Sequence, residues 1–91
     1  MRFTYGASFG RSLKKLHPHQ KAALDNALKL LLENPQEGDE KKGDLVGIYV
    51  LKFKVNRIEW LLAYRVVSKK EITLLVFGPH ENFYRNLKNS L

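Results

Sequence analysis

The sequence predicts one α+β domain, in which an N-terminal strand and a helical hairpin pack on a small antiparallel sheet and a short helix ends the chain. Apolar residues recur at helical spacing in the first third of the chain, and they alternate with polar residues in the second half. A length of 91 residues, of which 44% are hydrophobic, is sufficient for one core. We therefore expect residues 1–91 to form a single domain.

The first third of the chain predicts a short strand and then a helix. Phe3 and Tyr5 alternate with polar residues, as they would in a strand. A helix capped by Ser8 follows, and His17-Pro18 should end it, because proline disfavours helical geometry in the residue before it. The apolar stripe of this helix is Phe9, Leu13 and Leu16.

A second helix is predicted from Pro18 to about Glu33, since proline is well tolerated in a first turn. Asn34-Pro35 and Gly38 end this helix and open an acidic loop, which we interpret as a solvated connector. The apolar stripe of the helix is Leu24, Ala27, Leu28 and Leu31.

The second half predicts three strands and a terminal helix. Residues 48–55 and 58–67 alternate regularly, and the polar pair Asn56-Arg57 between them can turn a hairpin. Residues 72–77 are apolar on both faces, as in an inner strand that Gly78-Pro79 should stop, and a helix is expected from Glu81 to Leu91. The two N-terminal helices should cover one sheet face and leave the opposite face partly bare. The covered face carries Tyr49, Leu51, Phe53, Trp60, Leu62 and Tyr64.

Composition narrows the range of functions. The chain has no Cys, which excludes disulfides and zinc–thiolate sites, and no His, Asp and Glu cluster has metal-ligand spacing. No apolar run is long enough to span a bilayer, and the N-terminus lacks the apolar stretch of a signal peptide, so we expect a cytoplasmic protein with no membrane partner.

The net charge of +7 is distributed unevenly, because five of the nine acidic residues lie between Glu33 and Asp44. A basic body with one acidic loop is typical of proteins that bind nucleic-acid phosphates. A merely solubilising surface has the same composition.

Lys52 and Lys54 are two residues apart on a predicted strand, so their side chains leave the same face. Together they can hold a phosphate, and one of them can act as a base. Alternatively, they are solvated lysines that discourage pairing of the sheet edge.

His80 and Tyr84 should face one way if the terminal helix begins near Glu81. Histidine is the common general acid or base near neutral pH, and tyrosine can stack on a nucleobase. Alternatively, His80 caps a turn and Tyr84 fills the core, although Phe83 is better suited to burial. Candidate phosphate clamps are Arg57, Arg65 and Arg85.

The chain resembles the RelE/ParE superfamily of bacterial type II toxins over almost its whole length, in the order of its elements and in several short segments. These segments are Asn34-Pro35-x-x-Gly38, Gly43-Asp44-Leu45-x-Gly47, Leu62-Ala63-Tyr64-Arg65-Val66 and Gly78-Pro79-His80-Glu81-Asn82-Phe83-Tyr84. The last is similar to the C-terminal segment of the ribonuclease branch of the family.

The resemblance implies a toxin that cuts mRNA in the ribosomal A site without metal or small-molecule cofactor, and that a cognate antitoxin protein neutralises. In that scheme the 2′-hydroxyl of the RNA attacks the adjacent phosphate. Lys52 and Lys54 match strand lysines that hold phosphate, one of them acting as base. His80 matches the acid on the leaving oxygen, and Tyr84 matches an aromatic residue that orients the substrate base.

Leu61 departs from the family pattern, because the resemblance implies a phosphate-clamping arginine at this position of the strand. Either Arg65 or Arg85 replaces that arginine, or the clamp is absent. Two other functions therefore remain open: a ParE-like inhibitor of DNA gyrase, and a catalytically weak binding protein with the same fold.

Overall fold

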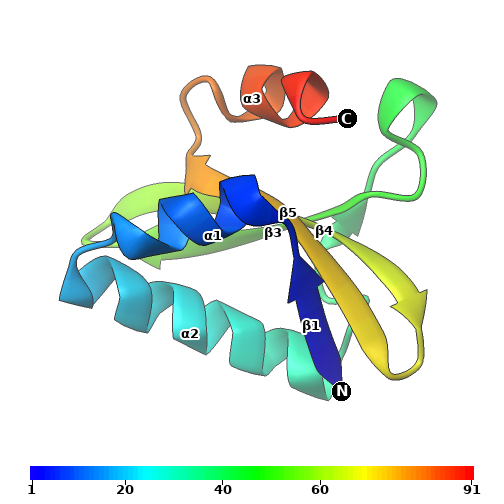
Figure 1. The fold of residues 1–91 in the computed structure, drawn as a ribbon, viewed down its shortest axis with the longest axis horizontal. Coiled ribbons are helices and arrows are strands. Elements are labelled where there is room, and N and C mark those ends of the chain that lie inside the picture. Colours follow the sequence, from blue (N-terminus) through cyan, green and yellow to red (C-terminus); the bar gives the residue numbers. More distant parts are fainter.

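The computed structural model describes residues 1–91 as a five-stranded sheet with helices on both faces (Figure 1). The predicted α+β class is confirmed. None of the helices is long and apolar enough to cross a membrane. In chain order the elements are β1 (Arg2–Tyr5), α1 (Ala7–Lys14), α2 (Pro18–Glu33), β2 (Asp39–Glu40), the 3₁₀ turn η1 (Gly43–Leu45), β3 (Tyr49–Val55), β4 (Ile58–Ser68), β5 (Glu71–Pro79) and α3 (Phe83–Asn89).

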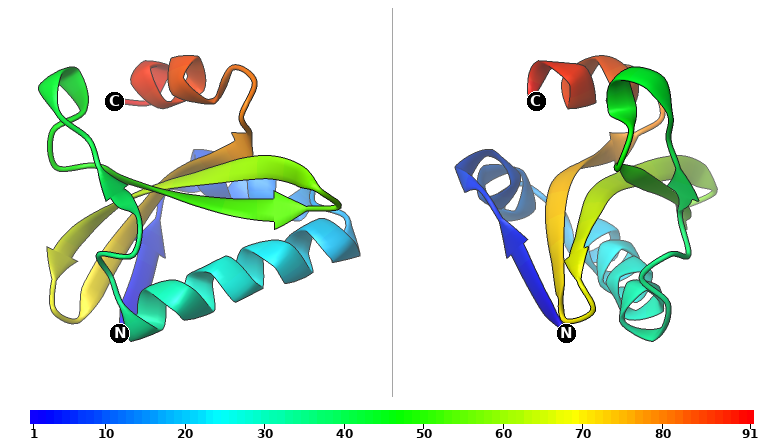
Figure 2. Two further views of the ribbon diagram at one scale, coloured as in Figure 1. Left: turned by 180° about the vertical axis from the view of Figure 1, so that it is seen from behind. Right: turned by 90° about the vertical axis from the view of Figure 1, so that its right-hand side faces the viewer.

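The strands lie in the order β1-β5-β4-β3-β2. Neighbours among β2 to β5 are antiparallel, but β1 pairs with β5 in parallel, so the sheet is mixed where an antiparallel one was predicted. A parallel pair cannot be joined by a tight turn. The chain instead leaves β1 at one edge, passes through α1 and α2 across one face, and enters β2 at the other edge (Figure 2).

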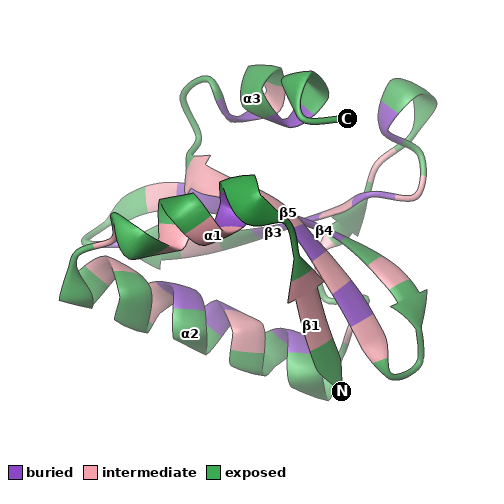
Figure 3. Ribbon diagram, viewed as in Figure 1, coloured by how far each residue is buried: buried purple, intermediate pink, exposed green.

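The first core lies between the helical hairpin and the sheet, as predicted. The inner side of α2 is buried and its outer side is exposed (Figure 3). Two details of α1 differ from the prediction. Its N-cap is Gly6, whose carbonyl accepts the Gly10 N–H at 3.1 Å, so Ser8 lies inside the first turn, and the helix ends at Lys14, before Leu16. The buried residues of this core are Phe9, Leu24, Ala27, Leu31, Leu51, Leu62, Tyr64, Ile72 and Leu74.

A second core lies on the opposite face of the sheet, which the sequence pattern predicts to be partly bare. The short helix α3 and the turn η1 cover much of this face, because both present apolar side chains to it. The exposed remainder includes Lys52 and Lys54. The buried residues of this second core are Leu45, Ile48, Val50, Leu61, Ala63, Phe83 and Leu87.

The acidic stretch after α2 is more ordered than a connector. Asp39 and Glu40 form β2 and pair with Val50 and Tyr49 of β3. A strand of two exposed acidic residues has no apolar alternation, so the sequence pattern could not reveal it.

Gly38 attaches the start of this stretch to the core. Its N–H donates to the Tyr64 hydroxyl at 2.9 Å, and a Cβ at Gly38 would come within 2.9 Å of that hydroxyl and of the Val50 carbonyl. The close approach therefore requires glycine. Tyr64 is fully buried. Burial raises the pKa of Tyr64 above its ordinary value of 10.0, an effect that the hydrogen bond from Gly38 partly offsets.

We expect Tyr64→Phe to lower the free energy of unfolding by about 1 kcal/mol at neutral pH, because it leaves the partly buried Gly38 N–H without its acceptor. Above pH 10 the unfolded state loses the Tyr64 proton while the native state still holds it, so the wild type loses stability as pH rises. The difference between the two proteins should therefore narrow above pH 10 in urea unfolding. A difference that stays constant with pH would contradict the assignment.

Candidate functional site

The β3–β4 hairpin fixes the positions of the two lysines. Lys52 lies opposite Leu61, and Lys54 lies opposite Glu59. The two-residue turn Asn56-Arg57 sets this register, with φ values of 50° and 72°. Positive φ at both central residues is the geometry of a type I′ turn, which is usually formed by residues that include glycine. Both lysine side chains are exposed and leave the sheet face that also carries the second core.

His80 is attached to the same end of the sheet. The pairing of β4 with β5 extends to Trp60 and Pro79, and one residue further the His80 N–H donates to the Glu59 carbonyl at 3.2 Å. Lys54, Glu59 and His80 therefore lie side by side on three neighbouring segments. The sequence reasoning placed the lysines and His80 in one site, and the topology brings their backbones together.

Tyr84 reaches His80 through a tight turn. Asn82 has a left-handed φ of 64°, and the Phe83 N–H donates to the His80 carbonyl at 3.2 Å, so α3 begins at Phe83 and not near Glu81 as predicted. The rings of His80 and Tyr84 are still in contact, with centroids 6.3 Å apart and an edge-on angle of 78°. Phe83 is buried and Tyr84 is partly exposed, as expected.

The three candidate arginines are dispersed. Arg57 is in the hairpin turn beside the lysine end of the sheet, and Arg85 is exposed on α3. Arg65 lies four residues from Leu61, about 13 Å along β4, and its Nη1 would be 3.5 Å from a Cβ at Gly47. Arg65 is therefore beside the η1 turn and away from the lysines.

Glu59 is a candidate that the sequence reasoning did not include. Its side chain is partly buried and shares the face of Lys54, its direct cross-strand partner. Directly opposite residues have Cβ atoms about 5 Å apart, so the carboxylate can interact with the lysine. The length of the Asn56-Arg57 turn, together with the alternation of β4, was the signal that could have identified this pair.

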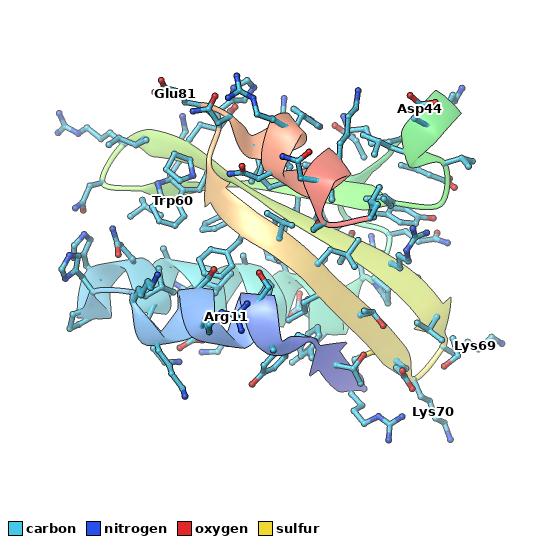
Figure 4. All side chains as sticks on the ribbon, turned by 45° about the horizontal axis from the view of Figure 1, so that its top comes forward. Arg11, Asp44, Trp60, Lys69, Lys70 and Glu81 are labelled. Carbon is cyan, nitrogen blue, oxygen red and sulfur yellow. The ribbon has the colours of Figure 1, made fainter.

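The cations of this face are free to meet a ligand. The chain has two ion pairs, Arg2 with Glu71 and Lys21 with Asp25. Neither pair involves Lys52, Lys54 or any of the three candidate arginines. The hollows of the surface lie elsewhere, beside the β4–β5 turn, along α1, and between α1 and α3. In Figure 4, Glu81 marks the His80 end of α3, and Lys69 and Lys70 lie far from it. An open cationic face suits an extended polymer better than a small molecule.

Comparison with known proteins agrees with the geometry. The family model described as "ParE-like toxin of type II bacterial toxin-antitoxin system" matches residues 4–88. No curated protein matches the sequence. Among solved structures, a double-arginine variant of the E. coli toxin RelE in the free state is similar with a TM-score of 0.72 at 19% identity, over 96% of this chain and 93% of that one. The isolated E. coli RelE toxin has a TM-score of 0.67 at 19% identity, over 98% and 97% of the two chains. At this identity the likeness concerns the fold.

Proposed function

The chain belongs to the ParE-like toxins of type II bacterial toxin–antitoxin systems, and we propose that within this family it acts as a ribosome-dependent mRNA endoribonuclease. Membership implies a cognate antitoxin as partner. Three observations support the finer proposal. Lys52 and Lys54 share one sheet face, the His80 N–H bonds to Glu59 opposite Lys54, and the His80 ring contacts Tyr84. The RelE-like structure adds support at the level of the fold.

The proposed chemistry is an in-line displacement at phosphorus. The neutral form of Lys54 takes the proton of the 2′-hydroxyl as the new 2′-oxygen–phosphorus bond forms. The bond from phosphorus to the 5′-oxygen breaks, and protonated His80 gives its proton to that leaving oxygen. The products are a 2′,3′-cyclic phosphate and a free 5′-hydroxyl.

The remaining groups bind and orient the RNA. Lys52 lies on the same face as Lys54 and can stabilise the charge that develops on the phosphate oxygens. The Tyr84 ring is partly exposed beside His80 and can stack on a nucleobase. Glu59, between Lys54 and His80, can hold their side chains in position by hydrogen bonds.

One observation favours a second candidate. The position that the family resemblance assigns to a clamping arginine is occupied by Leu61, which is uncharged and fully buried. A toxin without that clamp could inhibit DNA gyrase by binding and without cleavage. The same observation leaves room for a catalytically weak binding protein of this fold.

The two functions separate in paired assays of the purified protein. We expect cleavage of mRNA on programmed ribosomes, with 2′,3′-cyclic phosphate ends, and no effect on gyrase supercoiling. Intact mRNA together with inhibited supercoiling would favour the gyrase function. Intact mRNA and normal supercoiling would leave a binding protein.

A further inference from the structure

Lys41 differs from every other cation of the chain. All other Lys and Arg side chains are exposed, whereas Lys41 is partly buried. It lies in the most acidic stretch of the sequence, yet no carboxylate is within ion-pair distance of it. Its Nζ instead lies over the ring of Tyr84, 5.6 Å from the ring centroid. This is a cation–π geometry, and it joins Lys41 to a residue of the proposed site.

The segment around Lys41 is attached to the sheet by a hydrogen bond and to α3 by packing. The Lys41 N–H donates to the Ile48 carbonyl at 2.8 Å, which closes the η1 turn. Leu45 of this turn and Ile48, three residues after it, are buried against Phe83 and Leu87 of α3. Figure 4 shows the turn, marked by Asp44, at one end of α3 and the Glu81 segment at the other. The position of Lys41 relative to Tyr84 is therefore set by packing.

We propose that Lys41 is a phosphate-binding residue of the RNA site, held toward the substrate by the ring of Tyr84. This rests on the proposed ribonuclease function and extends it. Because Leu61 is buried beneath α3, β4 cannot supply a clamping cation at this position. Arg65 and the Lys41 backbone both lie beside the Gly47–Ile48 segment, but of the two only Lys41 places its cation over the Tyr84 ring. Lys41 supplies a positioned charge over the Tyr84 ring, from the stretch of the chain in which the sequence showed only an acidic loop.

The arrangement also constrains how a nucleobase meets Tyr84. Lys41 lies over the Tyr84 ring, and the Phe83 and His80 rings stand perpendicular to it, so a nucleobase can stack only on the part of the ring that these neighbours leave exposed. The RNA would then stack on Tyr84 while a backbone phosphate contacts Lys41. Binding of the base and binding of the phosphate would then both depend on the position of the Tyr84 side chain.

Lys42 provides a matched control, because it is the next residue and is exposed. Lys41→Gln and Lys42→Gln remove the same charge. On ribosomes programmed with mRNA that is 2′-O-methylated in the A-site codon, and so cannot be cut, Lys41→Gln should weaken toxin binding about tenfold, the effect of one charge-assisted hydrogen bond. Lys42→Gln should change binding less than about twofold, and Lys41→Arg should restore it.

Each other result has a distinct meaning. If the wild type binds the methylated ribosome complex, and Lys41→Gln binds it as tightly as Lys42→Gln does, the role of Lys41 is overturned and the ribonuclease proposal stays intact. A wild type that neither binds the methylated complex nor cuts ordinary mRNA would overturn both. Ring-proton NMR shifts of Tyr84 in the free protein should change in Lys41→Gln and not in Lys42→Gln, and their constancy in both would contradict the contact itself.

Discussion

Lys54→Met should slow cleavage of ribosome-bound mRNA by about 10²- to 10⁴-fold, the usual contribution of a general base. Methionine keeps most of the length of the side chain, unbranched and uncharged, and lacks the terminal nitrogen. Because Lys54 is exposed and has no ion-pair partner, the free energy of unfolding should change by less than about 0.5 kcal/mol. Single-turnover cleavage at saturating ribosome concentration, with urea unfolding alongside, measures both quantities.

Two further variants separate the base from a simple positive charge. Lys54→Arg keeps the charge but cannot release its proton near neutral pH, so it should be about as slow as Lys54→Met. Lys69→Met removes a charge at the distant β4–β5 turn and should cleave at the wild-type rate (Figure 4). Full activity in Lys54→Arg would mean that Lys54 only holds phosphate.

The hairpin that carries these lysines was predictable from sequence because its signals are local. Strict alternation over β3 and β4 assigned each residue to a face, and two polar residues between them gave the length of the turn. Once the turn has two residues, the register follows, and Lys54 must lie opposite Glu59. The alternation alone therefore assigned Lys52 and Lys54 to the correct face of the sheet.

The packing of α3 on that face of the sheet could not be predicted in the same way. The burial of Leu61 depends on where α3 folds back, and that depends on the left-handed conformation of Asn82, which no periodicity encodes. Asparagine tolerates this conformation better than most residues, but its presence does not impose it. The start of the helix was accordingly predicted at Glu81, two residues before Phe83.

Lys41 illustrates a second limit. Its relation to Tyr84 joins residues 43 positions apart in sequence, and it depends on the pairing of a two-residue strand with β3. In the sequence it stands among carboxylates, where an ion pair is the simplest expectation. Only the tertiary structure shows that it has none.

Leu61→Arg should destabilise the protein by about 4 kcal/mol or more, although it introduces the arginine that the family resemblance implies. Leu61 has no exposed surface and packs in one cluster with Phe83 and Leu87 of α3. A buried guanidinium without a partner carries a large desolvation cost, and its bulk would displace the helix. Urea unfolding followed by circular dichroism should show a lower midpoint, with cleavage reduced because displaced α3 no longer holds Tyr84 beside His80.

Leu61→Met is the matched control, since it keeps an apolar side chain of similar volume and should cost less than about 1.5 kcal/mol. If Leu61→Arg were as stable as Leu61→Met and cut mRNA faster, then α3 would not pack on Leu61 in solution, and the family position would still be the clamp. If it is destabilised as expected, the strand position belongs to the core in this chain. A clamping cation additional to Lys52 and Lys54 must then come from an exposed or loop-borne residue, and Lys41, whose Nζ lies over the Tyr84 ring, is the candidate that the geometry offers.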